Sequence, residues 1–544
     1  MRKKTVRETA ADRTVTIDGH GLGLEDLVDV ARGYAPVAVA AEALARVEAS
    51  RAAVDRAVAE GAVLYGVTTG FGRFSDVVLP AGEALGLQRN LILSHATGVG
   101  PPFGTDEVRA MLLLRANALA RGHSGVRPVV VRTLVEMLNR RVHPIVPQQG
   151  SLGASGDLAP LAHLTLVAIG EGWAEGPDGS TGPVPGRRAM AAAGLEPLVL
   201  EAKEGLALIN GTQAMTATLG LAVADALAVL EAATVAAALS LEATRGVLDA
   251  FDPRVAEVRP HPGQALVAAK VRELTRGSRY LTAAGQLRVQ DAYCLRCVPQ
   301  VHGAVADALA WTRGVVETEM NSATDNPLVF AEPFTLSSDL SSAPPRPTGA
   351  AVISGGNFHG EPVAFAGDLA GLAVAELASI SERRTARLVD PALSAGLPAF
   401  LTLRGGLNSG FMLVQYTAAA LVSENKILAS PASVDSIPSS AGQEDHVSMG
   451  TIAARKAREI VVNTARVVAA ELLTAAQAID LRGGLEKVAE PGSDPARLAE
   501  PLGEGTRRHY LRIRRESPFV AQDRPLAEDI ERLARLVLAG EFGW

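Results

Sequence analysis

The spacing of apolar residues predicts a mainly helical protein. Between residues 105 and 122, the segment TDEVRAMLLLRANALARG repeats apolar side chains every three or four positions, and Gly122 follows where a helix would end. Comparable runs occupy residues 128–142, 360–389 and 451–481, and the last two are long enough to form the core of a bundle. We therefore expect a mainly α fold with a long central helical bundle.

Strand signals are few and short. The segments TVTIDG, at residues 14–19, and GPDGSTGPVPG, at residues 176–186, have the composition of small hairpin elements at the edge of a helical body. Residues 332–349 are rich in Ser and Pro, which is typical of an irregular surface insertion. These segments add a few short strands and leave the helical prediction unchanged.

The length of the chain predicts more than one structural region. Its 544 residues are several times the usual length of a domain, although a large helical enzyme can form one unit. We expect an N-terminal region over residues 1–205 that carries a glycine-rich loop, a central helical-bundle region over 206–480 and a C-terminal helical region over 481–544. One function is expected from the regions together.

An apolar stretch at residues 211–246 raises the question of a membrane span. Asp225, Glu231 and Glu242 divide it into uncharged segments shorter than the roughly 18 residues that a span needs. A buried helix is therefore predicted here, and no membrane is expected as a partner.

The N-terminus and the cysteine count both indicate the cytoplasm. The first residues carry positive charge, but Glu8, Asp12 and Asp18 stand where a secretory signal would have an apolar run. Cys294 and Cys297 are the only cysteines, so the sequence has no disulfide framework and fits a reducing compartment.

Composition and charge narrow the nature of the core and of the partners. Hydrophobic residues make up 48% of the chain and aromatic residues 4%, so the core must consist mainly of Ala, Leu and Val, which suits close helix packing. The formal net charge is -7, and no long basic block interrupts it. This balance argues against a nucleic-acid surface and favours a small molecule as the partner.

The segment GSLGASGDLAPL, residues 150–161, carries the candidate chemistry. A phosphate-binding loop would need a following Lys-Ser or Lys-Thr and a preceding strand, and neither is present. A nucleophile elbow would need the spacing G-x-S-x-G, whereas Leu152 to Gly156 is L-G-A-S-G. A purely structural turn remains as one interpretation.

A second interpretation is that the backbone of this loop reacts with itself. The amide nitrogen of Gly156 would attack the carbonyl carbon of Ala154, and Ser155 would lose its hydroxyl as water. Each residue type suits this step, because Gly156 offers an unhindered nitrogen, Ala154 leaves its carbonyl open and Ser155 supplies the leaving oxygen. The product is an electrophile that no unmodified side chain provides.

The loop resembles the signature of the histidine and aromatic amino acid ammonia-lyases. In this family, Ala-Ser-Gly cyclises into a 4-methylidene-imidazole-5-one (MIO) group. Seven further blocks are similar to family blocks and stand in the family order over roughly residues 15–480: YGVTTGFG, LSHATGVG, EGLALINGTQ, VQDAYCLRCVPQV, NSATDNPLV, GGNFHGEPVAF and QEDHVSMG. The resemblance implies an almost entirely helical homotetramer whose active sites draw on three subunits, with MIO formed from Ala154, Ser155 and Gly156 and no external cofactor.

The resemblance also implies a carbon–nitrogen lyase and assigns its catalytic residues. Loss of ammonia from an α-amino acid requires an electrophile and a base that removes a weakly acidic proton from the β-carbon. By resemblance, Ser155 supplies the methylidene, and Tyr65 and Tyr293 surround the reacting carbons, with Tyr293 as the base. A buried tyrosine that only donates a hydrogen bond is the alternative for each.

Substrate-binding residues follow from the same blocks. Arg296 stands three residues after Tyr293, and its planar guanidinium suits the substrate carboxylate, although a lone arginine often forms a surface ion pair. Asn210 and Gln290 match family positions that hydrogen-bond near the carboxylate or the prosthetic group. Phe358 matches a residue that lines the pocket.

The cysteines and histidines do not indicate a metal site. Cys294 and Cys297 form C-x-x-C, but no second cysteine pair completes a metal site. His302, His359 and His446 lack the clustered spacing of metal-binding helices, so we interpret them as packed residues.

The block at residues 443–446, Gln-Glu-Asp-His, indicates the substrate. The tyrosine and phenylalanine enzymes of the family have a related NQD block, and Gln-Glu-Asp-His is the histidine type. A carboxylate at Glu444 can accept from an imidazole N–H, whereas a phenyl ring offers nothing to offset the burial of its charge. His95 is expected to contact the same ring. The predicted reaction is therefore elimination of ammonia from L-histidine to give urocanate.

Three departures loosen the prediction of the substrate. Gly442 stands where a larger residue is usual, Cys294 stands where serine is common, and the insertion at 332–349 is long. A tyrosine or phenylalanine ammonia-lyase or a 2,3-aminomutase of the same family is the alternative. A catalytically inactive helical scaffold would not need the intact triad and tyrosines, and the G-S-S loop of the fumarase and aspartase group is not found here.

Overall fold

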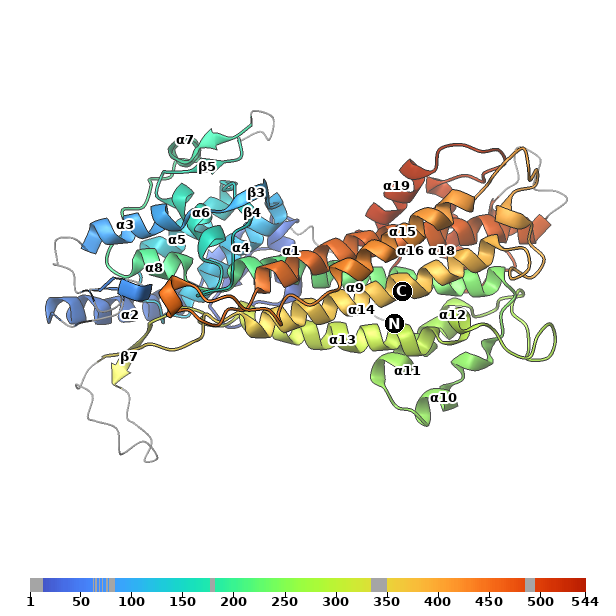
Figure 1. Cartoon of the computed structure of the whole chain (residues 1–544), viewed down its shortest axis with the longest axis horizontal. Coiled ribbons are helices and arrows are strands. Elements are labelled where there is room, and N and C mark those ends of the chain that lie inside the picture. The colour runs from blue at the N-terminus through green and yellow to red at the C-terminus, as the bar shows by residue number, and fades with distance from the viewer. Residues whose placement is uncertain are drawn as a thin grey trace. The chain divides into compact units, whose positions relative to one another are not determined.

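The structure is a computed structural model, and it confirms the mainly α fold with few short strands (Figure 1). It describes residues 13–61, 63, 66–67, 69–70, 72–74, 77, 84–176, 182–333, 350–484 and 495–544. Tyr65 and most of the predicted insertion, residues 334–349, lie outside the described residues.

The chain forms two compact units, and each unit is assembled from three separate stretches. Unit 1 consists of residues 1–221, 313–367 and 431–455, and unit 2 of residues 222–312, 368–430 and 456–544. The units are thus interleaved along the chain. The three consecutive regions inferred from the sequence stay a prediction.

Unit 1 holds most of the short elements. Its helices are α1 (Leu24–Ala31), α2 (Ala41–Ala59), α3 (Ala84–His95), α4 (Thr105–Ala120), α5 (Pro128–Asn139), α6 (Leu158–Ala168), α7 (Gly186–Ala192) and α8 (Glu204–Ile209), with 3-10 turns η2 (Gly72–Phe74) and η7 (Ser440–Gly442). Its strands are β1 (Val15–Ile17), β2 (Val37–Val39), β3 (Val99–Pro102), β4 (Pro147–Gln149), β5 (Trp173–Ala174), β6 (Val184–Pro185), β7 (Leu328–Pro333) and β8 (Ala350–Ile353).

Unit 2 is helical in all its described elements. It contains α10 (Pro253–Glu257), α11 (Pro262–Leu274), α12 (Tyr293–Arg296), α15 (Met412–Leu428), α17 (Pro495–Leu498), α18 (Glu504–Glu516) and α19 (Ala527–Leu538), with 3-10 turns η4 (Leu248–Phe251) and η6 (Ala399–Leu401). Phe251, Val267, Val271 and Leu295 belong to one buried apolar cluster of this unit. Leu295 therefore anchors the short helix α12 in the core.

The longest helices contribute residues to both units. They are α9 (Gln213–Ala243), α13 (Val298–Met320), α14 (Glu361–Val389) and α16 (Gly450–Gly484). The helices predicted from apolar spacing are confirmed as α4, α5, α14 and α16. Their ends agree with the sequence signals, since Pro128 opens α5 and Gly122 has a left-handed φ of 81° after α4.

Helix α9 is the buried helix predicted at residues 211–246. By length and composition, α9 and α14 are both apolar enough to cross a membrane. However, 78% of the apolar window of α9 and 61% of that of α14 is buried inside the protein. Most of each apolar window is therefore covered by other parts of the protein.

Two predicted hairpins have different outcomes. Strand β1, within TVTIDG, pairs in parallel with β2, so the hairpin prediction was wrong there. A parallel pair needs a crossover, which α1 supplies between the two strands. Strands β5 and β6 pair antiparallel, as expected around residues 176–186.

Helix α4 forms the centre of unit 1. Every residue from Glu107 to Ala120 is buried, and α4 packs against both α1 and α5. Beside it, α3, α6 and α8 pack against one another (Figure 1). These three helices border the candidate site.

Candidate active site

A cavity of about 1060 Å³ in unit 1 brings together residues from distant blocks of the sequence. Five of the predicted site residues line it, namely His95, Ser155, Asn210, Phe358 and Glu444. They come from α3, the Ala-Ser-Gly loop, the end of α8, the segment before α14 and the segment after η7. Folding therefore brings motifs that are far apart in the sequence together in one concave site.

The Ala-Ser-Gly loop forms a tight turn at the wall of this cavity. Ser155 and Gly156 have left-handed φ values of 57° and 76°, and Gly153 and Gly156 are bridged to each other. A Cβ added to Gly156 would lie 2.1 Å from the carbonyl oxygen of Gly211. Only glycine fits at this position, because any side chain would push the loop away from Gly211.

Gly211 holds the loop through backbone hydrogen bonds. The amide of Gly211 donates to the carbonyl oxygen of Ser155 at 3.2 Å, and the amide of Asp157 donates to the carbonyl oxygen of Gly211 at 2.6 Å. The turn is therefore clamped on both sides of Gly156. Such a clamp restricts the backbone to the close approach that the turn requires.

Asp157, directly after the triad, is fully buried and surrounded by donors. Its carboxylate accepts from the hydroxyls of Ser151 (2.8 Å) and Thr451 and from the amide of Met215 (2.8 Å). Burial raises the pKa of Asp157, and the hydrogen bonds from these groups oppose the rise. Asp157 thereby ties the loop to the starts of α9 and α16.

The side-chain amide of Asn210 is held through its nitrogen. Its Nδ2 donates to Asp325 Oδ1 at 3.2 Å and to the carbonyl oxygen of Asn326 at 3.0 Å. Asp325 is itself paired with the buried Lys203, at 2.6 Å. Among the described residues, Asn210 Oδ1 has no hydrogen-bond partner. This amide is thus oriented by an ion pair and keeps one acceptor for a ligand.

His95 and Glu444 both line the cavity and carry the candidate contacts to a polar ring. His95 Nδ1 lies 2.9 Å from the carbonyl oxygen of Leu91, which indicates that this nitrogen is the protonated one. Burial lowers the pKa of His95, so the ring is neutral near pH 7 and its Nε2 is an acceptor. Ser439 Oγ donates to Glu444 Oε2 at 3.2 Å and steadies the carboxylate.

The turn before Glu444 has an unusual backbone. Ser440, Ala441 and Gly442 have φ values of 51°, 55° and 84°, so three consecutive residues are left-handed. Ser440 and Ala441 line the cavity. Gly442, one of the departures in the sequence, has a left-handed φ that glycine adopts without strain.

The structure places three predicted residues elsewhere. Gln290, Tyr293 and Arg296 belong to unit 2 and are not among the described residues that line the cavity. Tyr293 is 71% exposed, and the guanidinium carbon of Arg296 lies 4.8 Å from the centre of its ring. Arg296 Nε is buried without a hydrogen-bond partner among the described residues.

The cysteines and the buried histidine that the sequence analysis considered lie among packed residues. Cys294 and Cys297 are free and half-buried, and His302 is fully buried between Thr234 and Arg384. Burial lowers the pKa of His302 far below its usual value. Within the described part of the chain, no group of three or more His, Cys, Asp or Glu side chains could hold a metal ion.

Sequence reasoning missed the face of α3 that lines the cavity. Leu87, Asn90, Leu91 and Ser94 lie there beside His95. These positions are three or four residues apart, so one helical face carries all of them. The signal was available, because His95 marked the face and the spacing would have extended it toward the start of the helix.

Comparison with known proteins agrees with these features. The family described as aromatic amino acid lyase matches residues 22–514. The chain belongs to the aromatic amino acid lyase family. The family predicted from the sequence is therefore confirmed.

Relatives from this family cover nearly the whole chain. The histidine ammonia-lyase of Alkaliphilus oremlandii is 54% identical over 97% of this chain and 98% of that protein. The structure of histidine ammonia-lyase from Trypanosoma cruzi has a TM-score of 0.84 and 40% identity, covering 97% of this chain and 94% of that one. Tyrosine aminomutase from Streptomyces globisporus has a TM-score of 0.87 and 39% identity, covering 97% and 98%. The backbone fold is thus shared by lyases and aminomutases of the family.

Proposed function

We propose that this protein is a histidine ammonia-lyase, which converts L-histidine to urocanate and ammonia. The observation that carries the proposal is one cavity lined by Ser155, His95 and Glu444. Ser155 is the residue from which the electrophile would form, and His95 and Glu444 offer polar atoms to an imidazole ring. Two relatives that are histidine ammonia-lyases, at 54% and 53% identity, support the same substrate.

The residues of the loop fit the MIO prosthetic group. Cyclisation joins the amide nitrogen of Gly156 to the carbonyl carbon of Ala154 with loss of one water, and Ser155 loses a second water as its methylidene forms. The tight turn and the requirement for glycine at 156 suit this ring closure. The group supplies an electrophile to which the substrate adds, and the remaining chemistry belongs to side chains of the protein.

Polar groups of unit 1 orient the substrate in this proposal. The Glu444 carboxylate accepts from the single N–H of a neutral imidazole, and the His95 ring lies at the wall of the same cavity. Asn210 Oδ1 accepts from a donor on the amino acid end of the substrate. Phe358 covers the ring with apolar surface. An imidazole thus gains hydrogen bonds that a phenyl ring cannot form.

Proton removal and carboxylate binding are assigned to the segment around α12. Tyr293 takes the β-proton through its phenolic oxygen, and Arg296 pairs with the substrate carboxylate, with Gln290 nearby in sequence. Tyr65 completes the proposed set of catalytic residues. The exposure of Tyr293 in the single chain supports a site that is completed by other copies.

A homotetramer with sites built from three subunits is therefore part of the proposal. Exposed apolar side chains on α15, namely Leu413, Tyr416 and Ile427, support burial against another copy of the chain. The cytoplasm is the proposed location.

A tyrosine ammonia-lyase or 2,3-aminomutase is the second candidate. The specific observation in its favour is the close backbone agreement with tyrosine aminomutase from Streptomyces globisporus. The substrate assay below separates the two, since an aminomutase would yield a β-amino acid without release of ammonia.

The deciding experiment measures turnover of free L-histidine, L-tyrosine and L-phenylalanine by the purified enzyme. Urocanate is followed by its ultraviolet absorption, coumarate and cinnamate by theirs, and β-amino acids by chromatography. We expect histidine to be strongly preferred and the intact mass to be lower than the translated mass by two waters. Faster conversion of tyrosine than of histidine would refute the assignment.

A further inference from the structure

Gln88 is a buried glutamine behind the cavity wall. It lies on α3, whose residues Leu87 and Leu91 line the cavity, but it is 0% exposed and is not itself a lining residue. Both ends of its amide are occupied by backbone groups of other segments. A buried side-chain amide is costly unless its hydrogen bonds are satisfied, and these backbone groups satisfy them.

The oxygen of the Gln88 amide holds the start of α8. Helix α8 begins after Lys203, whose side chain is engaged with Asp325 and does not cap the helix. The amides of Gly205 and Leu206 donate to Gln88 Oε1, at 2.9 and 3.4 Å. Gln88 thus satisfies two donors that a helix start leaves free, and it does so from a different helix.

The close approach of α3 and α8 depends on glycine. A Cβ added to Gly205 would lie 2.7 Å from the carbonyl oxygen of Gln88 and 3.0 Å from its Oε1. The amide oxygen reaches the helix only because Gly205 has no side chain. Helix α8 leads directly to Asn210, whose amide lines the cavity, and to Gly211, which clamps the Ala-Ser-Gly loop.

The nitrogen of the same amide holds a third segment. Gln88 Nε2 donates to the carbonyl oxygen of Gly66 at 3.4 Å. Gly66 directly follows Tyr65 in the chain, and its own amide donates to Thr69 Oγ1 at 3.1 Å. One side chain therefore connects α3, α8 and the segment that carries Tyr65.

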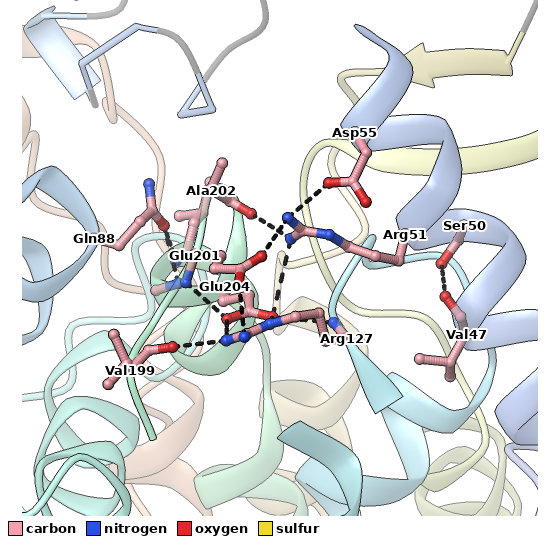
Figure 2. Close-up of polar contacts among 12 residues, drawn as sticks. Val47, Ser50, Arg51, Asp55, Gln88, Arg127, Val199, Glu201, Ala202 and Glu204 are labelled. Atoms are coloured by element: carbon pink, nitrogen blue, oxygen red, sulfur yellow. Dashed lines mark hydrogen bonds and ion pairs between the residues drawn. The ribbon is translucent and has the colours of Figure 1, made fainter. Parts of the chain in front are cut away.

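Figure 2 shows Gln88 directed at the start of α8, next to a cluster of ion pairs. On the other side of this helix start, the Glu204 carboxylate accepts from Arg127 Nε at 2.8 Å and Nη2 at 2.7 Å. The start of α8 is therefore held from two sides, through its backbone amides by Gln88 and through the side chain of Glu204 by Arg127. Only Gln88 also reaches the segment at Gly66 among the residues of this cluster that Figure 2 labels.

We propose that Gln88 is a positioning residue, whose two amide ends set Gly66 in place relative to α8 and thereby set Gly70 and Gly72, which line the cavity, relative to Asn210 and the Ala-Ser-Gly loop. This inference rests on the proposed function, because it assigns Gln88 a part in histidine turnover. Gln88 contacts neither the substrate nor the reacting atoms. Its effect is transmitted through backbone hydrogen bonds.

The substitution Gln88→Glu tests the two hydrogen-bonding ends of the side chain separately. The carboxylate keeps an acceptor for Gly205 and Leu206, but it loses the donor to Gly66 and places a second acceptor against that carbonyl. We expect kcat/KM for histidine to fall at least about tenfold at pH 8.5 relative to the wild type, because misplacement of a catalytic segment is costly. Lowering the pH protonates the introduced carboxyl, restores a donor and should reduce the deficit relative to the wild type at each pH.

Gln477→Glu is a matched control. Gln477 is also 0% exposed and bridges backbone groups, donating to Val520 O at 2.9 Å and accepting from Val520 N at 3.1 Å. It belongs to unit 2 and is not among the residues that line the cavity. We expect this variant to lose thermal stability while its kcat/KM per folded protein stays within twofold of the wild type.

Two results would overturn the proposal. One is a Gln88→Glu variant with kcat/KM equal to that of the control. The other is a loss that does not change with pH, which indicates general damage to the fold. Hydrogen exchange on the wild type keeps the test open if the variant does not fold, because rapid exchange of the Gly205 and Leu206 amides would exclude the contact with Gln88.

Failure of the proposed function remains distinguishable. In that case the wild type itself would not convert histidine, whereas hydrogen exchange at Gly205 and Leu206 would still report whether Gln88 holds α8. If the wild type converts histidine and these amides are protected, only the kinetic comparison decides the role of Gln88.

Discussion

Candidate catalytic residues line a cavity in unit 1, whereas the candidate base Tyr293 on helix α12 of unit 2 is exposed. Around the cavity, segments that are far apart in the sequence meet, and His95, Asn210 and Glu444 are each held by hydrogen bonds to neighbouring groups. On α12, Leu295 is buried in the core, whereas Tyr293 is 71% exposed. One region encloses its chemistry within the chain, and the other presents it outward.

A single chain is sufficient to position the residues of the cavity, but it leaves Tyr293 exposed. The unit 1 residues have their polar contacts from the same chain, so their geometry follows from folding alone. Tyr293 is 71% exposed beside the half-buried Arg296, so its side chain is accessible to another surface. The proposed assembly from several copies accounts for this exposure, and the following experiments test the contrast.

The largest effect is expected in the enclosed region. Ser155→Ala removes the only oxygen from which the methylidene can form, so turnover of histidine should fall by on the order of 10³-fold or more. Intact mass spectrometry should find the variant without the loss of two waters, and thermal melting should match that of the wild type. Turnover close to the wild-type rate would refute the self-cyclisation of the loop.

The second effect tests the outward-facing region. Tyr293→Phe keeps the ring and removes the hydroxyl, so kcat should fall by about 10²–10³-fold if this group takes the proton. Because the side chain is exposed in the single chain, stability of the folded subunit should change little.

A mixing experiment distinguishes the two regions directly. If Ser155 and Tyr293 of one site come from different chains, refolded mixtures of the inactive Ser155→Ala and Tyr293→Phe variants should recover part of the activity. Mixtures as inactive as each variant alone would indicate that each chain builds its own site.

A smaller effect is expected at Glu444 on the cavity wall. Glu444→Ala should lower kcat/KM for histidine by about 10–100-fold, the range for loss of a hydrogen bond to a charged group, and Glu444→Gln should lower it less. Asp445→Asn is the control, because the neighbouring Asp445 is exposed and is not among the described residues that line the cavity. An equal loss from both substitutions would contradict a specific contact with the substrate ring.

The smallest effect on activity is expected from a titratable group inside unit 2. Burial raises the pKa of Glu242 to about 7, against hydrogen bonds that include the amide of Gly503 at 2.8 Å. The unfolded carboxyl ionises near its usual pKa, so this group costs stability increasingly as the pH rises from about 4.5 to 7, by on the order of 3 kcal/mol in full.

Glu242→Gln should therefore make the protein more resistant to urea at pH 8 and leave kcat unchanged. The gain should largely disappear near pH 4.5, where the folded carboxyl is neutral and the unfolded one is only about half ionised. A gain of equal size at both pH values would contradict the titration of Glu242.

Much of the local structure could be predicted from the sequence, and the errors have a common cause. The apolar spacing at residues 105–122 and 451–481 was sufficient for α4 and α16, because a helix closes its hydrogen bonds within one segment. The error at TVTIDG arose because strand pairing joins distant segments, and β2 lies beyond α1 in the chain. The three left-handed residues 440–442 likewise could not be predicted, because they follow neither a helical nor a strand pattern.

The helical class, the family and the identity of the chemical groups could all be inferred from the sequence, because they depend on local periodicity and on residue types at short spacing. The packing of the folded chain was needed to show that His95, Ser155 and Glu444 share one cavity whereas Tyr293 is exposed. It also decided that Gln88, which no motif marks, lies between α8 and Gly66. The physical reason is that burial and hydrogen-bond partners depend on which distant segments pack together, and this information is distributed over the whole chain.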